Sequence, residues 1–270
     1  MPAAARSCAP RRKRFGQHFL HDPQVLKRIV RALGPQPHDH LVEIGPGRGA
    51  LTAELLAANA GTLDAIEIDR ELAGELRARF ASTRHWTLHE GDALRFDYQA
   101  LARARSGRLR IVGNLPYNIS TPLLFQLLAA APAIIDLTVM LQREVVERLA
   151  ARPGGGDYGR LTVMLAPYAA VERLFDVGPG AFQPPPKVWS ALVRISMLPA
   201  ALFPVSPSYG AVVAAAFAGR RKTLRNALGR LLSREQISAC AVDPGARPET
   251  LPPAAFNTLA QALDRARAGR

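Results

Sequence analysis

The chain has 270 residues, 48% of them hydrophobic, so it can bury a large core in one main domain with an appendage. No apolar run approaches a membrane span, the first ten residues lack a signal-peptide core, and Cys8 and Cys240 lie far apart without metal-site spacing. These features exclude a membrane protein and a disulfide scaffold, predict no metal site, and favour the cytoplasm. The net charge of +13 is uneven, because residues 1–40 carry 8 basic and 2 acidic side chains, residues 41–199 carry 17 and 16, and residues 200–270 carry 10 and 4.

A near-neutral body between two basic ends suits a protein that grips a polyanion. A GC-rich genome, which enriches Arg, is the competing explanation. The first basic run is Arg11-Arg12-Lys13-Arg14, and Phe15-Gly16-Gln17-His18-Phe19-Leu20 follows it. Asp22 and Pro23 are then typical of a helix start, and apolar residues recur at helical spacing from Val25 to Leu33.

A Gly-rich turn follows the first predicted strand, residues 41–44, and precedes a predicted helix over residues 50–56. The turn reads Gly45-Pro46-Gly47-Arg48-Gly49, with an acidic residue two positions before its first glycine. Strand, glycine turn and helix form the first unit of a nucleotide-binding sheet. The spacing is one residue shorter than in a dinucleotide site and matches the pattern of S-adenosylmethionine sites.

Acidic residues follow the next two predicted strands. Glu67 ends the strand over residues 63–68, and an acid at that point can accept hydrogen bonds from both ribose hydroxyls. A helix begins at Asp69, a short strand covers residues 86–89, and Asp92 comes in the next loop, where it could accept from an adenine amine. Glycine, acid and acid in three loops at one sheet edge predict a cofactor site at that edge.

The sequence Gly113-Asn114-Leu115-Pro116-Tyr117-Asn118 follows a predicted strand over residues 109–112 and precedes a helix over 122–128. The Asn114 oxygen and the Leu115 carbonyl, whose direction Pro116 constrains, could hold both hydrogens of an exocyclic nucleobase amine. Tyr117 offers a face on which the base can stack. These groups suit methylation of such an amine, although Asn and Pro also form ordinary turns after strands.

The remaining pattern predicts three more strands, over residues 134–141, 171–177 and 191–195, and helices over 143–151 and 160–169. Between the last two strands, Phe182 is a candidate second stacking face and Lys187 a candidate phosphate contact. From about residue 199 only helices are predicted, over 209–217, 220–232 and 254–267. The basic residues of the second of these, Arg220, Arg221, Lys222, Arg225 and Arg230, are expected to form a stripe that contacts phosphates.

In this order, the motifs resemble those of the ribosomal RNA adenine dimethyltransferase family over nearly the whole chain. They include the segments 12–20, 43–52, 67–69, 91–93, 113–120, 142–145, 182–188 and 217–224. The most similar branch is the bacterial one that dimethylates two adjacent adenines near the 3′ end of small-subunit (16S) ribosomal RNA.

The resemblance implies an α/β fold: a Rossmann-like, seven-stranded S-adenosylmethionine-dependent methyltransferase domain over residues 1–198 and a small helical RNA-binding domain over 199–270. The expected partner is the RNA of an immature small subunit, bound by a monomer without metal. The cofactor would be bound by His18, Leu20, Gly45, Gly47, Glu67, Asp92 and Asn114. The catalytic set would be Asn114, Leu115, Pro116, Tyr117 and Phe182.

Two positions depart from the family pattern. His18 stands where many members have Asn, and Trp189 stands where an Asp often precedes the Ser-Ala of the last strand. Two other functions stay open: a resistance-type methyltransferase of large-subunit RNA, in which Ile is expected in place of Leu115, and a non-catalytic RNA-binding relative.

Overall fold

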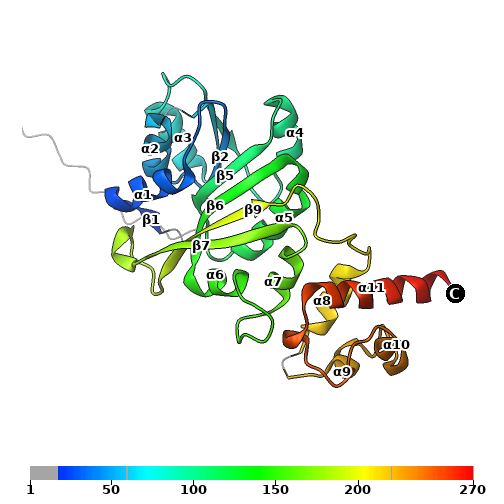
Figure 1. The fold of residues 1–270 in the computed structure, drawn as a ribbon. Coiled ribbons are helices and arrows are strands. Elements are labelled where there is room, and N and C mark those ends of the chain that lie inside the picture. Colours follow the sequence, from blue (N-terminus) through cyan, green and yellow to red (C-terminus); the bar gives the residue numbers. More distant parts are fainter. Residues whose placement is uncertain (1–17, 59, 220, 270) are drawn as a thin grey trace, which may run out of the picture.

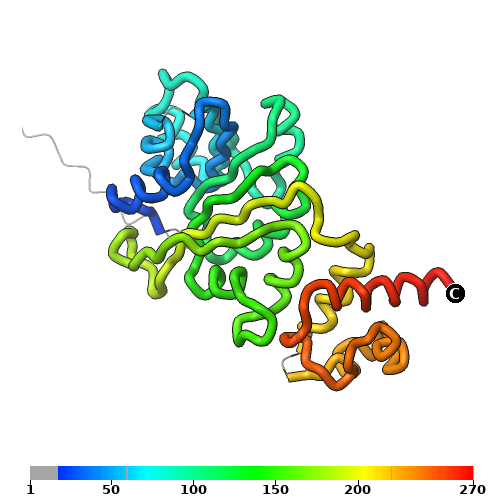
Figure 2. The backbone as a smooth tube through the Cα atoms, in the orientation of Figure 1, coloured from blue at the N-terminus to red at the C-terminus, as the bar shows by residue number. Residues whose placement is uncertain are grey.

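The structure is a computed structural model that describes residues 18–58, 60–219 and 221–269. The basic run Arg11–Arg14 therefore lies outside the described residues, as does Arg220. Figure 1 shows a central sheet with helices on both faces and a group of helices at the C-terminal end beside it. The backbone trace in Figure 2 follows the chain through the sheet first and the helical group last.

The described part of the chain contains nine strands. In chain order they are β1 (Phe19–Leu20), β2 (His40–Ile44), β3 (Thr62–Glu67), β4 (Trp86–Glu90), β5 (Leu109–Asn114), β6 (Ile134–Gln142), β7 (Ala169–Val177), β8 (Phe182–Gln183) and β9 (Ser190–Met197). Seven of them form one sheet, so each of the seven predicted strands is present.

The helices connect and follow these strands. They are α1 (Pro23–Leu33), α2 (Ala50–Ala57), α3 (Arg70–Arg79), α4 (Tyr98–Ala104), α5 (Ser120–Ala129), α6 (Arg143–Leu149), α7 (Arg160–Leu165), α8 (Tyr209–Ala216), α9 (Leu224–Leu228), α10 (Arg234–Ala239) and α11 (Pro253–Ala268). Helix α1 begins as predicted, because the Asp22 carboxylate accepts hydrogen bonds from the backbone N–H groups of Gln24 and Val25.

The large sheet has the strand order β4-β3-β2-β5-β6-β9-β7. Strands β4, β3, β2, β5 and β6 run parallel, and β9 is antiparallel to both β6 and β7. The chain therefore moves outward in one direction from β2 and in the other from β5, which makes the β2–β5 border a topological switch point. Ligands of open α/β sheets bind at the carboxyl ends of strands at such a point.

Gly113 allows β2 and β5 to approach closely at this border. A Cβ atom at Gly113 would lie 2.5 Å from the carbonyl oxygen of Ile44. No side chain fits in that space, so the glycine before Asn114 lets the loop after β5 lie close to the end of β2.

Two hydrophobic clusters cover the two faces of the sheet, and a third fills the C-terminal helices. Val193 and Ile195 of β9 belong to the cluster with α4, α5 and α6, whereas Leu192 belongs to the cluster with α1 and α2. This alternation is that of a strand buried on both faces. The third cluster contains residues of α8, α9, α10 and α11 together with Tyr158 and Val163, so the helical group packs against α7. The domain division after residue 198 stays a prediction.

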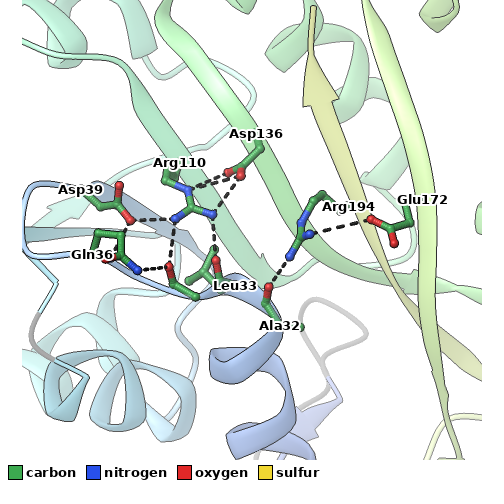
Figure 3. Close-up of polar contacts among 9 residues, drawn as sticks. Ala32, Leu33, Gln36, Asp39, Arg110, Asp136, Glu172 and Arg194 are labelled. Carbon is green, nitrogen blue, oxygen red and sulfur yellow. Dashed lines mark hydrogen bonds and ion pairs between the residues drawn. The ribbon is translucent and has the colours of Figure 1, made fainter.

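A polar network holds the C-terminal end of α1 against the sheet near the amino end of β5 (Figure 3). The Arg110 guanidinium on β5 donates to Asp39 at 2.7 Å, to Asp136 on β6 at 2.9 Å, and to the Leu33 carbonyl at 2.8 Å. Arg194 on β9 donates to the carbonyl of Ala32. The negative end of the α1 dipole thus faces two cations.

The predicted helix over residues 220–232 is wrong. Arg221 has a φ of 67°, in the left-handed region, and the helix α9 begins only at Leu224. The N–H groups of Leu224 and Arg225 donate to the carbonyls of Ala246 and Pro244. In a helix that began earlier, they would donate to carbonyls of the preceding turn. Of the described basic residues, only Arg225 lies in α9, so the predicted stripe along one helix does not form.

Other boundaries differ for local reasons. Helix α7 ends at Leu165 instead of residue 169, close to Pro167, which cannot continue a helix. Helices α4 and α10 and the small β1–β8 pairing were not predicted.

Candidate active site

A cavity of about 300 Å³ lies at the switch point. The Gly-rich turn after β2, the end of β3, the loop after β4 and the loop after β5 line it, together with residues 18–20. Apart from Phe182, every residue predicted for the cofactor or the target base lines this one cavity: His18, Leu20, Gly45, Gly47, Glu67, Asp92, Asn114, Leu115, Pro116 and Tyr117. The carboxyl ends of adjacent parallel strands bring them together.

The glycines of the turn leave backbone exposed to the cavity. Gly45 has a φ of 67°, and no atom lies within 4 Å of the position that its Cβ would occupy. Gly47 has a φ of 58°, and its Cβ would lie 2.9 Å from the ring of Phe19. A side chain at Gly45 would strain the backbone and fill open space, and one at Gly47 would displace Phe19.

Glu67 is held at the end of β3 by backbone donors. Its carboxylate accepts from the N–H of Gly47 at 3.1 Å with one oxygen and from the N–H of Asp69 at 2.9 Å with the other. Burial raises the pKa of Glu67, although these two hydrogen bonds act to lower it. Each oxygen keeps a further lone pair, so the carboxylate can accept two more donors, such as a pair of hydroxyl groups.

Glu43 is a second buried carboxyl group of the cavity, only 1% exposed. Burial raises its pKa to about 7, against a 2.6 Å hydrogen bond from the Thr52 hydroxyl, and nearby Glu67 adds to the increase. Glu43 was not among the predicted site residues. In the sequence, its position two residues before Gly45 identified the type of Gly-rich turn. That position did not indicate that the Glu43 side chain lines the cavity.

Asp92 lies in the loop after β4. One of its carboxylate oxygens accepts from the N–H of Leu94 at 2.9 Å. No described residue donates to the other oxygen. Asp92 therefore offers an acceptor to the cavity, at some distance along the sheet edge from Asn114, since β3 and β2 lie between β4 and β5.

The orientation of the Asn114 amide is fixed by the segment before α1. Its Nδ2 donates to the carbonyl oxygen of His18 at 2.8 Å, and a carbonyl can only accept. The Asn114 oxygen must therefore point the other way, and no described residue donates to it. This places an unused acceptor at the cavity.

The backbone of Leu115 presents a second acceptor. Its N–H donates to the Met140 carbonyl at 3.1 Å, and its side chain is 1% exposed. Both the backbone and the side chain of Leu115 are therefore held in place. No donor among the described residues reaches its carbonyl oxygen. Pro116 follows and constrains the direction of that carbonyl.

The Tyr117 ring is held by its hydroxyl. The hydroxyl oxygen lies 2.6 Å from Oγ of Ser190 at the start of β9, and the ring centroid lies 5.8 Å from that of His18. Burial raises the pKa of Tyr117, so its hydroxyl stays protonated at neutral pH. The ring of His18 is itself fixed, since its Nδ1 donates to the Pro184 carbonyl at 2.7 Å.

Phe182 is not placed as expected. It is 2% exposed, pairs with Leu20 across the small β1–β8 sheet, and belongs to the hydrophobic cluster with α1 and α2. Its ring does not line the cavity, so in this arrangement it offers no face to a base. Its observed role is to attach residues 18–20 to the body of the protein.

The described residues hold no group of three or more His, Cys, Asp or Glu side chains that could ligate a metal ion. In the same part of the chain, no helix is both long and apolar enough to cross a membrane.

Comparison with known proteins identifies the family. The family described as "Ribosomal RNA adenine dimethylase" matches residues 9–265 of this chain. The chain belongs to this family. Its members are enzymes, and this chain is accordingly a methyltransferase of the ribosomal RNA adenine dimethylase type.

Relatives with similar sequences share one name. Proteins called ribosomal RNA small subunit methyltransferase A are 54% identical in Pseudomonas fluorescens, over 93% of this chain and 93% of theirs, and 56% identical in Nitrosococcus oceani, over 89% and 91%.

Solved structures agree with the fold. A dimethyladenosine transferase from Plasmodium falciparum superposes with a TM-score of 0.75 over 92% of this chain and 98% of its own, at 24% identity. The 23S rRNA methyltransferase ErmE superposes with a TM-score of 0.69 over 91% and 99%, at 29% identity. The seven-stranded, Rossmann-like methyltransferase sheet followed by helices is thus a fold that this chain shares with both solved structures.

Proposed function

We propose that this protein uses S-adenosylmethionine to dimethylate the N6 atoms of two adjacent adenines near the 3′ end of small-subunit ribosomal RNA, in an immature subunit in the cytoplasm. The observation that carries the proposal is the fixed amide of Asn114. Its oxygen and the Leu115 carbonyl form a pair of acceptors beside the cavity, in a family of adenine dimethylases.

The polar groups that line the cavity suit S-adenosylmethionine. Gly45 and Gly47 permit close approach of the ligand to the backbone, Glu67 would accept from the ribose hydroxyls, and Asp92 from the adenine amine. His18 and Leu20 would cover the methionine end next to Asn114. When bound, the cofactor supplies a methyl group on a positively charged sulfur, which leaves as a neutral thioether.

The two acceptors act on the target nitrogen. The lone pair of an exocyclic amine is delocalised into the base, which makes it a poor nucleophile. Hydrogen bonds from its two hydrogens to Asn114 and Leu115 would favour a tetrahedral nitrogen and hold it in line with the methyl group. The methylated nitrogen is cationic until it loses a proton to water. The amine then keeps one hydrogen, so one acceptor is enough to orient it for the second transfer.

Tyr117 would hold the base itself. An adenine that reacts at N6 must leave its stack, and an aromatic face replaces part of the stacking that it loses. The hydrogen bond with Ser190 keeps the ring in place before the base arrives, so little rotamer freedom is lost on binding.

The names of the relatives favour the small-subunit substrate over the two other functions considered. Ribosomal RNA small subunit methyltransferases A are more than 50% identical to this chain, whereas ErmE, named for 23S RNA, is 29% identical. The chain also keeps Leu115, where a resistance-type enzyme is expected to have Ile.

The test is methyl transfer from labelled S-adenosylmethionine to unmodified small subunits, followed by mapping of the label. We expect label on two adjacent adenines near the 3′ end of the RNA. Asn114→Ala should lose about 100-fold or more in turnover, as for other positioned polar groups. Asn226→Ala, an exposed Asn of α9, is the matched control and should retain activity.

Thermal unfolding of both variants would show that the fold is intact. Label at other positions of the small-subunit RNA, or no transfer by the wild type, would refute the proposed function. Turnover by Asn114→Ala close to that of the wild type would refute the role of the amide.

A further inference from the structure

Three consecutive exposed residues precede β9: Lys187, Val188 and Trp189, here called the 187–189 patch. Trp189 is 51% exposed and Val188 is 44% exposed. Few large apolar side chains of the described residues are that exposed. None of the three lines the cavity or has a part in the proposed chemistry.

The patch lies next in sequence to a residue that contacts Tyr117, in the loop after β5. Trp189 is followed directly by Ser190, whose hydroxyl is 2.6 Å from that of Tyr117. Consecutive Cα atoms lie about 3.8 Å apart, so the patch begins one residue away from the group that positions the proposed stacking ring. A strand of RNA with one base on Tyr117 would pass over this part of the surface with its next nucleotide.

The indole is held and not merely exposed. The N–H of Arg143, at the start of α6, donates to the Trp189 carbonyl at 2.9 Å, which fixes the backbone at the end of the sheet. The Trp189 side chain lies beside Gly178. A Cβ atom at Gly178 would be 3.5 Å from the six-membered ring of the indole, which is an ordinary van der Waals distance. The ring thus rests against Gly178 while about half of the residue stays accessible.

The charge of the patch suits a nucleotide. Lys187 is exposed, and no carboxylate among the described residues lies within ion-pair distance of its ammonium group. The nearby Arg143 guanidinium is by contrast paired with Glu147 at 3.3 Å. A free cation two residues from an exposed indole can contact a phosphate while the indole stacks on the base of the same nucleotide.

We propose that Trp189 is an RNA-binding residue, on which the base next to the target adenine stacks in single-stranded substrate RNA, with Lys187 at its phosphate. The inference rests on the proposed function, since it needs a flipped adenine at Tyr117. Flipping removes one stacking partner from the neighbouring base, and Trp189 supplies a replacement.

The first test is the KM for unmodified small subunits. Loss of a base–aromatic stack corresponds to a rise of about 5-fold to 100-fold for Trp189→Ala. Trp189→Phe, which keeps an aromatic face, should restore most of the loss. Leu202→Ala is the matched control, because Leu202 is 68% exposed but follows the opposite end of β9, and its KM should stay unchanged.

The second test is direct, because the chain has only two tryptophans. Trp86 is half-buried and packs on Phe80 with ring centroids 5.3 Å apart, so Trp86→Phe leaves Trp189 as the single fluorophore. Addition of small-subunit RNA should quench its emission, and S-adenosylhomocysteine alone should not.

An unchanged KM in Trp189→Ala, or unquenched emission of the Trp86→Phe protein at saturating RNA, would overturn the inference. Failure of the proposed function is distinguishable, because then the wild type itself would transfer no methyl group to small subunits.

Discussion

At the scale of single residues, the cavity places two buried carboxyl groups close together. Glu43 and Glu67 are 1% and 2% exposed and repel each other when both are ionised. Glu67 is stabilised as a carboxylate by two backbone donors, whereas Glu43 has the Thr52 hydroxyl. Different environments thus separate the pKa values of two adjacent acids, and Glu43 is the one that titrates near neutral pH.

Glu43 should make stability fall with rising pH. Its pKa is about 7 in the folded protein and near 4.5 in the unfolded chain, so between these values the folded state binds more protons. The free energy of unfolding should therefore decrease from pH 4.5 to 7, by a few kcal/mol at most, and level off above. Glu43→Gln keeps an acceptor for Thr52 and cannot ionise.

The measurement is urea unfolding of wild type and Glu43→Gln between pH 5 and 8. The stability of the variant relative to the wild type should rise with pH, and taking this difference removes the contributions of the other titrating groups. A difference that is flat across this range would show that Glu43 is ionised throughout.

The same residues show how far the sequence predicts the site. Gly45, Glu67, Asp92 and Asn114 could be placed together because each follows a strand, and parallel strands end at one edge. The burial of Phe182 could not, because it results from the pairing of β1 with β8, which joins residues more than 160 positions apart through two-residue strands. Such short pairings leave no periodic signal.

At the scale of elements, Arg110 connects β5 with three other parts of the fold (Figure 3). The sequence placed it in a predicted apolar strand, and nothing local indicates its partners, which lie 26 to 77 positions away. Its side chain is 12% exposed, and those of Asp39 and Asp136 are 6% and 11% exposed. The network thus holds the C-terminal end of the helix whose first residue, Pro23, lies shortly after residues 18–20 of the cavity wall.

Replacement of Arg110 should destabilise the protein strongly. Arg110→Met would leave Asp39 and Asp136 buried without a cation and remove a donor from the C-terminal end of α1. Breaking a buried ion pair in this way costs about 3–5 kcal/mol. Arg173→Met is the control, because its pair with Asp176 is more exposed, at 39% and 29%, and such pairs contribute about 1 kcal/mol or less.

Urea unfolding would measure both variants. Equal, small losses of stability would mean that the Arg110 network is replaceable by packing alone. A loss confined to Arg110→Met would identify the network as the attachment of α1 to the sheet.

The strands of the large sheet were predicted from the sequence more accurately than the C-terminal helices were. All seven large-sheet strands were predicted, because apolar runs between turn residues have few other solutions. The helix over 220–232 failed because Arg221 adopts a left-handed conformation and Leu224 and Arg225 bond to the segment around Pro244. Helical propensity alone cannot anticipate a partner that lies twenty residues further on.

At the scale of the whole molecule, the basic residues gather where the fold has no sheet. Residues 200–270 carry 10 basic and 4 acidic side chains against 17 and 16 in residues 41–199. Arg221, Lys222, Arg225 and Arg230 are exposed, and none forms an ion pair with a described residue. Cations elsewhere are often paired, for example Arg77 with Glu90 at 3.0 Å. Although no single helix carries the cluster, its free charges still suit the RNA backbone.

The salt dependence of RNA binding should show whether these cations contact RNA phosphates. Each phosphate contact releases counterions, so the triple variant Arg221→Ala, Lys222→Ala, Arg225→Ala should bind more weakly and flatten the slope of log K against log salt by about 0.7–0.9 per lost contact. The matched control replaces Arg70, Arg77 and Arg148, which are exposed but paired with Glu90 or Glu144, and so removes the same net charge.

The control should keep nearly the slope of the wild type, because its cations already have partners. Affinity for S-adenosylhomocysteine should stay unchanged in both variants, since the cavity lies at the carboxyl edge of the sheet, between β2 and β5. Equal slopes for the two triple variants would mean that RNA affinity follows net charge and not these positions. In that case the C-terminal cations form a solvated surface, and the contacts to RNA must come from other parts of the chain.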